Sequence, residues 1–275
     1  MTRRLFASVS AVAFSLATAV AQQPVPASYY QVSFIKAKPG KLTDYEAFLK
    51  KNLPGIAKSQ IKDGKWLGWA FANVVTPTGS AEEHDLVGVY AYDKFEQLEP
   101  EDAPSDTIKS AIKALGFASP EDYYTKRDAL RDIVRSEFWR LRTSTTATAG
   151  TASKPGDYVV TTFLKMNPGK EADYLDVWKK YSLPIQEDRV KAGKLKSYSM
   201  WSVLGATGTE SKYDMVSLAR YGSFKDLASE DDLAELDKAS EQIHPGKDWR
   251  QMRRDMVGLR SVYRSEVIKI QDVVR

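Results

Sequence analysis

The segment FIKAKPGKLTDY at residues 34–45 decides the fold, because it recurs as FLKMNPGKEADY at residues 163–174. The offset between the two copies, 163 minus 34, is 129 residues. The same offset relates Gly64 to Gly193, Asp85 to Asp214, Tyr92 to Tyr221, and the tripeptide Arg-Ser-Glu at 135–137 to its copy at 264–266. Leu53-Pro54 and Leu183-Pro184 depart from it by one residue, since 183 minus 53 is 130. One offset that survives over this length predicts a duplicated module.

The two copies are separated by residues 143–155, which are rich in Thr, Ala, Ser and Gly. This composition is typical of a flexible linker. We therefore expect one module over residues 28–142 and a second over residues 156–275.

Each copy has the pattern of an α+β module. A segment of β-branched and aromatic residues predicts a first strand at Tyr30–Lys36 and at Tyr158–Lys165. A Pro-Gly break and a segment with apolar residues at helical spacing follow. The remaining strands are expected at 66–75, 86–92 and 133–141 in the first copy and at 195–203, 215–221 and 262–270 in the second. Charged helical segments precede the last strand, so each copy is predicted to be a ferredoxin-like βαββαβ module.

Two such modules in one chain predict an internal dimeric α/β barrel. A ferredoxin-like sheet carries its helices on one face, and its other face has to be covered. The second sheet supplies that cover and closes a barrel, whose interior is either filled by side chains or left as a pocket.

Residues 1–21 have the features of a secretory signal peptide. Arg3 and Arg4 precede an apolar run from Leu5 to Val20, and Ala19-Val20-Ala21 offers a small-x-small cleavage site. An uncleaved membrane anchor is the alternative, although the run is shorter than the roughly 20 residues that span a bilayer. We expect an exported protein, periplasmic or secreted, with no membrane contact after cleavage.

The composition excludes several chemistries. The chain has no cysteine, so disulfides, cysteine-ligated metals and thiol nucleophiles are ruled out. Two histidines and no carboxylate cluster at ligand spacing give no basis for a metal site, and we expect no cofactor. The formal net charge of +4 gives no electrostatic reason to expect nucleic-acid binding.

The repeated segment resembles a known fold family. Lys-x-x-Pro-Gly-Lys at 36–41, Asp-Tyr at 44–45, KWLGW at 65–69 and HDLVGVYAY at 84–92 are similar to the dimeric α/β-barrel superfamily. Within it, they most resemble NIPSNAP-like and antibiotic-biosynthesis-monooxygenase-like domains. The resemblance implies a barrel, and activities that include cofactor-independent oxygenation, haem binding or degradation, and stress roles.

The resemblance also implies a candidate site. The monooxygenases place Asn, Trp and His around a pocket, and the first copy offers Asn73, Trp66, Trp69 and His84. The second copy has Ser202, Leu195, Tyr198 and Tyr213 at the same offset, so such a site could exist only once. His84 is either a proton shuttle or ligand, or an exposed loop residue. His244 is either an axial haem ligand or a cation at a helix C-terminus.

The repeated Arg-Ser-Glu is the most specific polar feature. Strand alternation puts Arg135 and Glu137 on one face, and Arg264 and Glu266 on the equivalent face. Facing the barrel interior, these pairs could bind a carboxylate or a polar ligand head. Alternatively, they form a fixed lattice of ion pairs between the sheets. Aromatic residues, among them Trp66, Trp69 and Tyr198, either line an apolar pocket or belong to the core.

Two functional hypotheses follow. The first is an exported protein that binds a small apolar or carboxylate-bearing ligand or an interaction partner, and that self-associates. The second is a cofactor-independent monooxygenase-like or haem-handling enzyme. A filled barrel with paired Arg and Glu residues favours the first, whereas an open pocket with a histidine pointing inward favours the second.

Overall fold

The computed structural model describes residues 27–79, 82–99, 103–146, 152–205, 211–229 and 232–275. The first half of the chain contains β1 (Tyr29–Ala37), α1 (Leu42–Lys62), β2 (Gly68–Thr76), β3 (Leu86–Tyr92), η1 (Phe95–Leu98), α2 (Asp106–Ala114), α3 (Pro120–Asp128) and β4 (Arg131–Ser144). The second half contains β5 (Tyr158–Met166), α4 (Glu171–Val177), η2 (Trp178–Ser182), α5 (Leu183–Lys191), β6 (Ser197–Val203), β7 (Met215–Tyr221), η3 (Lys225–Ser229), α6 (Leu233–Ile243), α7 (Trp249–Val257) and β8 (Arg260–Val274). Strands and helices follow the same order in both halves.

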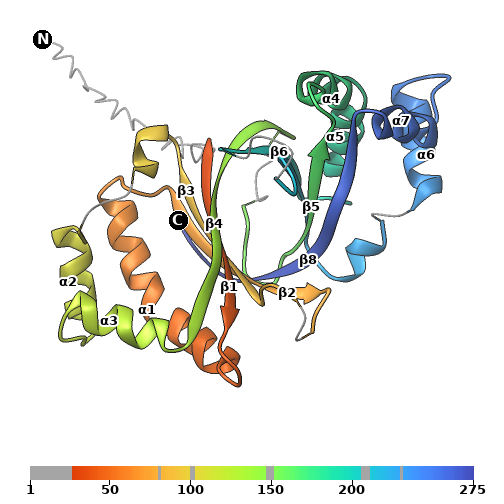
Figure 1. The fold of residues 1–275 in the computed structure, drawn as a ribbon. Coiled ribbons are helices and arrows are strands. Elements are labelled where there is room, and N and C mark those ends of the chain that lie inside the picture. Colours follow the sequence, from red (N-terminus) through yellow and green to blue (C-terminus); the bar gives the residue numbers. More distant parts are fainter. Residues whose placement is uncertain (1–26, 80–81, 100–102, 147–151, 206–210, 230–231) are drawn as a thin grey trace, which may run out of the picture.

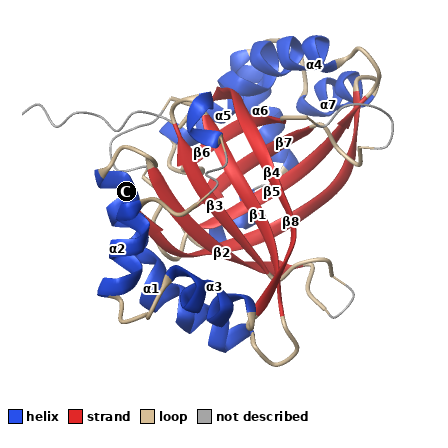
Figure 2. Cartoon of the chain, turned by 60° about the vertical axis from the view of Figure 1, so that its left-hand side comes forward, coloured by secondary structure: helices blue, strands red, loops and turns tan. Residues whose placement is uncertain are grey.

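The eight strands close into a barrel in the order β1-β3-β2-β8-β5-β7-β6-β4 (Figure 2). All of the described strand pairs are antiparallel. Two pairs, β2 with β8 and β4 with β6, join the first half of the chain to the second. The predicted α+β barrel is therefore confirmed.

The barrel interior is filled by apolar side chains. One cluster draws buried residues from all eight strands, including Val32 and Phe34 of β1, Trp139 of β4, and Phe163 of β5. The two halves meet directly inside it, where the ring of Tyr30 stacks on that of Trp201 with centroids 4.0 Å apart. Of the two alternatives for the interior, side-chain filling is thus the observed one.

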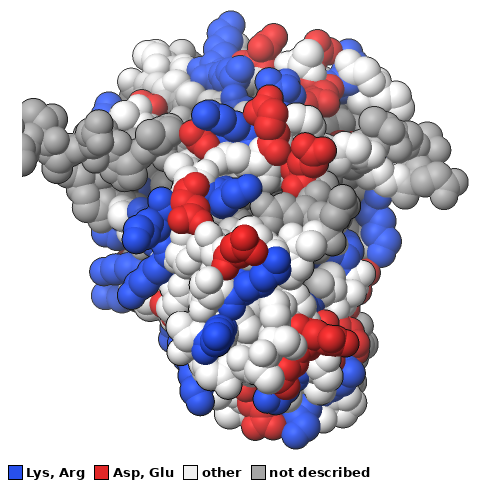
Figure 3. Space-filling view, turned by 90° about the vertical axis from the view of Figure 1, so that its left-hand side faces the viewer, with Lys and Arg blue, Asp and Glu red and all other residues white. Residues whose placement is uncertain are grey.

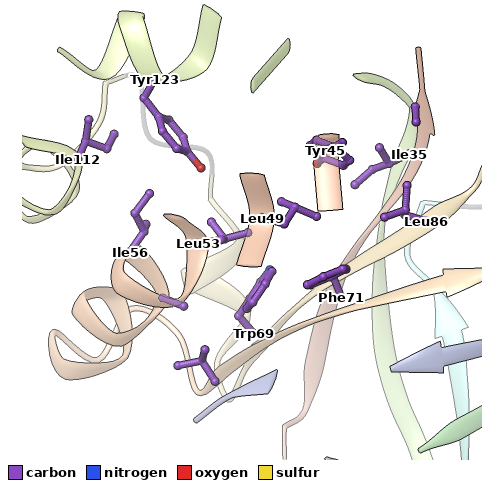
Figure 4. Close-up of a cluster of buried hydrophobic side chains, with 13 residues drawn as sticks. Ile35, Tyr45, Leu49, Leu53, Ile56, Trp69, Phe71, Leu86, Ile112 and Tyr123 are labelled. Carbon is purple, nitrogen blue, oxygen red and sulfur yellow. The ribbon is translucent and has the colours of Figure 1, made fainter. Parts of the chain in front are cut away.

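Helices cover the outside of the barrel in two layers. Figure 1 shows α1, α2 and α3 on one side of the strands and α4 to α7 on the opposite side. Beneath the first layer, Tyr45, Leu49 and Leu53 of α1 pack on Trp69 and Phe71 of β2 (Figure 4). Leu49 is 3% exposed, and Trp69 is also 3% exposed. The outward faces of the strands are therefore buried by the helices.

The second half differs from the first by a π-helical turn. Helix α1 runs without interruption, whereas the equivalent helix is divided by η2, a π-helix at Trp178–Ser182. A π-turn accommodates one additional residue within a helix. Its position explains why Leu53-Pro54 and Leu183-Pro184 are separated by 130 residues instead of 129.

Strand β4 extends to Ser144, two residues into the predicted linker. Thr145 continues this contact, because the backbone N–H of Tyr198 donates a hydrogen bond of 3.0 Å to its hydroxyl. The predicted signal peptide at 1–21 and residues 147–151 of the linker lie outside the described residues. Among the described helices, none is both long and apolar enough to cross a membrane.

Charges of both signs are spread over the surface. Figure 3 views the molecule from the side of α1, α2 and α3, and Lys or Arg and Asp or Glu side chains occupy the same face. This distribution matches the small net charge of the sequence. The absence of nucleic-acid binding stays a prediction.

Candidate functional site

A pocket lies beside the part of β4 that has no pairing with β6. Strand β1 pairs with β4 along residues 131–140, but β6 pairs with it only along residues 139–144. A pocket of about 620 Å³ lies beside the edge of β4 that β6 leaves unpaired. It is lined by residues 134–138 of β4, residues 203–205 and 211–213 at the two ends of the β6–β7 connection, Glu83, and Tyr263 of β8. We call it the mouth pocket.

Arg135 and Glu137 line this pocket from alternate positions of β4. Arg135 Nε donates a hydrogen bond of 2.8 Å to Glu137 Oε1 and one of 3.2 Å to the hydroxyl of Tyr213. The guanidinium carbon lies 3.6 Å from the ring centroid of Phe34, a cation–π contact. The predicted shared face is present, because Trp139 follows on the same side and lies in the barrel interior.

Glu137 is held as a fixed carboxylate by three side-chain donors. Besides Arg135, Trp139 Nε1 donates a hydrogen bond of 2.8 Å to its Oε2, and the hydroxyl of Tyr213 donates a short hydrogen bond to its Oε1. Burial and the neighbouring charge of Glu137 raise the pKa of Tyr213, so its hydroxyl stays protonated and remains a donor. Together the three donors occupy both oxygens of the carboxylate and fix its position in the barrel wall.

Glu83 bridges two cations at the rim of the pocket. Its Oε2 accepts a hydrogen bond of 2.9 Å from Arg135 Nη1, and its Oε1 accepts one of 3.0 Å from Lys212 Nζ. The hydrogen bond from Lys212, together with the charge of Arg135, lowers the pKa of Glu83. Glu83 and Lys212 occupy equivalent positions in the repeat, since 212 minus 83 is 129.

A second polar cluster surrounds Glu266 of β8. Arg264 Nη2 lies 3.3 Å from Glu266 Oε2 and 2.8 Å from Glu82 Oε2. His84 Nε2 lies 3.2 Å from Glu266 Oε2, and both side chains are 1% exposed. His84 also contacts the ring of Phe34 edge-on, with centroids 4.9 Å apart.

The interpretation of His84 as an exposed loop residue is therefore wrong. The end of the β2–β3 connection turns its imidazole toward β8, where Glu266 and Phe34 cover it. Its Nδ1 atom has no hydrogen-bond partner among the described atoms. His84 and Tyr213 stand at equivalent positions and each contacts the Glu of the opposite half, so the two clusters share one plan with different side chains.

The tryptophans and the asparagine implied by the resemblance lie elsewhere. Trp69 is buried beneath α1, and Trp66 is half-buried against Tyr90 with ring centroids 4.8 Å apart. Asn73 Nδ2 donates a hydrogen bond of 2.5 Å to Glu46 Oε1 of α1, on the helix side of β2. The structure therefore separates Trp66, Trp69 and Asn73 from His84, which faces the barrel.

Tyr198 also lies on the helix side. Its ring packs against Trp178 of η2, with centroids 5.3 Å apart. Arg135 and Glu137 are thus the predicted ligand-binding residues that line the mouth pocket, whereas Arg264, Glu266 and His84 form the neighbouring cluster.

The two histidines do not fit a haem site. His244 is the residue that ends α6, and its Nε2 lies 3.1 Å from the carbonyl oxygen of Tyr181. This placement agrees with the helix-terminus interpretation. His84 is enclosed by Glu266 and Phe34, and the barrel interior is filled. The described residues contain no group of His, Asp and Glu able to hold a metal ion.

The sequence patterns do not single out Glu83, Lys212 and Tyr263 of the mouth pocket, and they give Tyr213 only as the counterpart of His84. Tyr213 could have been found from the repeat, because it stands at the position equivalent to His84. Lys212 and Tyr263 carry no motif, and only the approach of the two halves brings them together.

Comparison with known proteins identifies the fold. No family model and no curated protein matches the chain. A candidate monooxygenase from Fusobacterium nucleatum is similar over 90% of this chain and 94% of its own, with a TM-score of 0.55 at 8% identity. A candidate monooxygenase from Lactobacillus acidophilus is similar over 90% and 95%, with a TM-score of 0.51 at 7% identity. A heme-binding protein from Thermus thermophilus covers 90% and 92%, with a TM-score of 0.48 at 11% identity.

The strand order and the first two of these likenesses define the class of fold. The chain has the dimeric α/β-barrel fold that the first two of these structures share. Identities this low establish the fold alone, and one fold carries many activities. The narrower NIPSNAP-like assignment stays a prediction.

Proposed function

We propose that this chain binds a small organic substrate in the mouth pocket and acts as a monooxygenase-like enzyme that needs no bound cofactor. The observation that carries the proposal is the pocket itself, which joins two cations, Arg135 and Lys212, to an apolar wall. The shared fold of two candidate monooxygenases supports the same class of activity.

Oxygenation without a cofactor requires a substrate that supplies the electrons. A substrate with an acidic methylene loses a proton to solvent water, and the resulting anion transfers electrons to dioxygen. The carbon gains one oxygen atom as a carbonyl, and the second oxygen leaves as water, so R₂CH₂ and O₂ give R₂C=O and H₂O. Positive charge near the substrate lowers its pKa and favours the anion. Arg135 and Lys212 would supply that charge.

A non-catalytic ligand-binding protein is the second candidate. The contacts of both pocket carboxylates favour it, because Glu137 accepts hydrogen bonds from three donors and Glu83 from two cations. The filled barrel interior points the same way. In this case the pocket holds a small apolar or carboxylate-bearing ligand without converting it.

We also propose export, tandem duplication and self-association. The charged start, apolar run and small-x-small site of residues 1–21 support a signal peptide. The offset of 129 residues and the shared order of elements support two tandem NIPSNAP-like modules. Exposed apolar side chains at equivalent positions of β4 and β8, Ile133 with Val134 and Val262 with Tyr263, support self-association.

Oxygen uptake with an anthrone tests the proposed activity, because this tricyclic compound has an acidic methylene. The account predicts uptake above the uncatalysed rate, one O₂ consumed per anthrone oxidised, and loss of this activity in Arg135→Gln. Binding without oxygen uptake would favour the second candidate. If the chain neither binds the anthrone nor takes up oxygen, the assignment of the pocket is contradicted.

A further inference from the structure

We propose that Glu83 occupies the anion position of the mouth pocket, and that the natural ligand carries a carboxylate that enters by displacing it. This inference rests on the proposed use of the pocket, and it names the class of molecule bound there. Glu83 then acts as an internal competitor that a ligand has to replace.

The contacts of Glu83 are those expected of a bound carboxylate. One oxygen accepts from Arg135 Nη1 at 2.9 Å, and the other accepts from Lys212 Nζ at 3.0 Å. Charge-assisted hydrogen bonds to both oxygens are the usual mode of carboxylate recognition. The two cations therefore form a ready site for any carboxylate that replaces Glu83.

Glu83 can leave this position, whereas Glu137 cannot. The side chain of Glu83 is 39% exposed, and it comes from the β2–β3 connection instead of a strand. Exposed ion pairs contribute little net stability, so replacing the Glu83 carboxylate with another anion has a small free-energy cost. Glu137 is 13% exposed, and its removal would leave the donors Trp139 Nε1 and the Tyr213 hydroxyl without their acceptor.

The apolar residues that line the pocket indicate the chemistry of the ligand beyond its carboxylate. Apolar residues line the same pocket from three parts of the chain, namely Val134 and Phe138 at the open edge of β4, Val203 and Leu204 at the end of β6, and Tyr263 of β8. A volume of about 620 Å³ admits a molecule of one to three fused rings. The geometry thus fits an apolar or aromatic monocarboxylate.

A fluorescence titration of the full chain with 2-naphthoate tests the role of Glu83. Glu83→Gln removes the internal anion and should bind 2-naphthoate more tightly, by about fivefold, since the exchanged ion pair is exposed. Glu82→Gln is the matched control, because this adjacent carboxylate pairs with Arg264 instead. It should change the affinity by less than about twofold. The neutral analogue 2-naphthamide should bind Glu83→Gln and the unchanged chain equally.

The outcomes separate this inference from the proposed function. Binding of 2-naphthoate that Arg135→Gln abolishes, but that Glu83→Gln leaves unchanged, would overturn the role of Glu83 and keep the pocket. Equal tightening by Glu82→Gln and Glu83→Gln would reduce the effect to net charge and also overturn it. No binding of 2-naphthoate to any folded variant would overturn both. Circular dichroism of each variant verifies folding.

Discussion

At the scale of single residues, the mouth pocket is defined by how two carboxylates share Arg135. Glu137 binds its Nε from within the barrel wall, and Glu83 binds its Nη1 from the rim. Burial makes the first contact expensive to break, whereas solvent weakens the second. The same guanidinium therefore has one permanent partner and one exchangeable partner.

This difference predicts unequal costs for two identical substitutions. Glu137→Gln replaces one of the two accepting oxygens with an NH₂ group, which leaves the donors on that side without an acceptor. It should lower the free energy of unfolding by about 3 kcal/mol. Glu83→Gln should lower it by less than about 1 kcal/mol. Urea denaturation measures both values, and equal losses would contradict the assignment of roles.

The repeat predicted the Arg and Glu pairs but not the surroundings of His84. The offset placed Arg135 with Arg264 and Glu137 with Glu266, and strand alternation placed each pair on one face. The burial of His84 depends on Glu266, which lies 182 positions away in the sequence. The local sequence around His84, which is a group of charged loop residues, does not predict a contact with a residue so far along the chain.

At the scale of elements, α1 is held by a narrow apolar stripe on β2. The stripe includes Tyr45, Leu49 and Leu53, which contact the outward face of the strand (Figure 4). Strand alternation places Trp69 and Phe71 on one face, but it does not say whether that face meets the helices or the barrel. Either side of the sheet is apolar, so the choice depends on the three-dimensional packing.

Leu49→Ala tests the contribution of this stripe. Removal of a buried leucine side chain leaves a cavity and should lower the free energy of unfolding by about 3 kcal/mol. Leu42→Ala on the same helix is the control, because Leu42 is 40% exposed and should cost under about 0.5 kcal/mol. Thermal or urea unfolding gives the comparison. A Leu49→Ala protein as stable as the control would show that α1 does not pack as described.

The stability of α1 should also depend on alkaline pH. Burial raises the pKa of Tyr45 to about 12 from its ordinary value of 10.0. The neutral phenol is thus favoured in the folded state, and this contribution is complete below pH 10 and is lost as the pH rises toward 12. Urea midpoints between pH 9 and 12 should fall more steeply for the unchanged chain than for Tyr45→Phe. Parallel curves would contradict the prediction.

At the scale of the whole molecule, the two halves form one cooperative unit. They share two strand pairs and one interior, where Tyr30 of the first half stacks on Trp201 of the second. The duplicated sequence was sufficient to predict a closed barrel, since each sheet needs a cover. It could not predict the mouth pocket, because the edge of β4 is uncovered only where β6 ends its pairing.

A shared interior predicts a single unfolding transition. Trp201→Ala should destabilise both halves together, by about 4 kcal/mol, because its ring contacts residues from each of them. Hydrogen exchange of strands β1 and β5 in this variant measures the two halves separately. Faster exchange confined to β5 would contradict a shared core.

The most direct test of the mouth pocket is a crystal structure of the chain with 2-naphthoate bound. We expect the carboxylate within hydrogen-bond distance of Arg135 and Lys212, the rings against Phe138 and Tyr263, and Glu83 turned away from both cations. A complex in which 2-naphthoate binds elsewhere, while Glu83 still bridges Arg135 and Lys212, would contradict it.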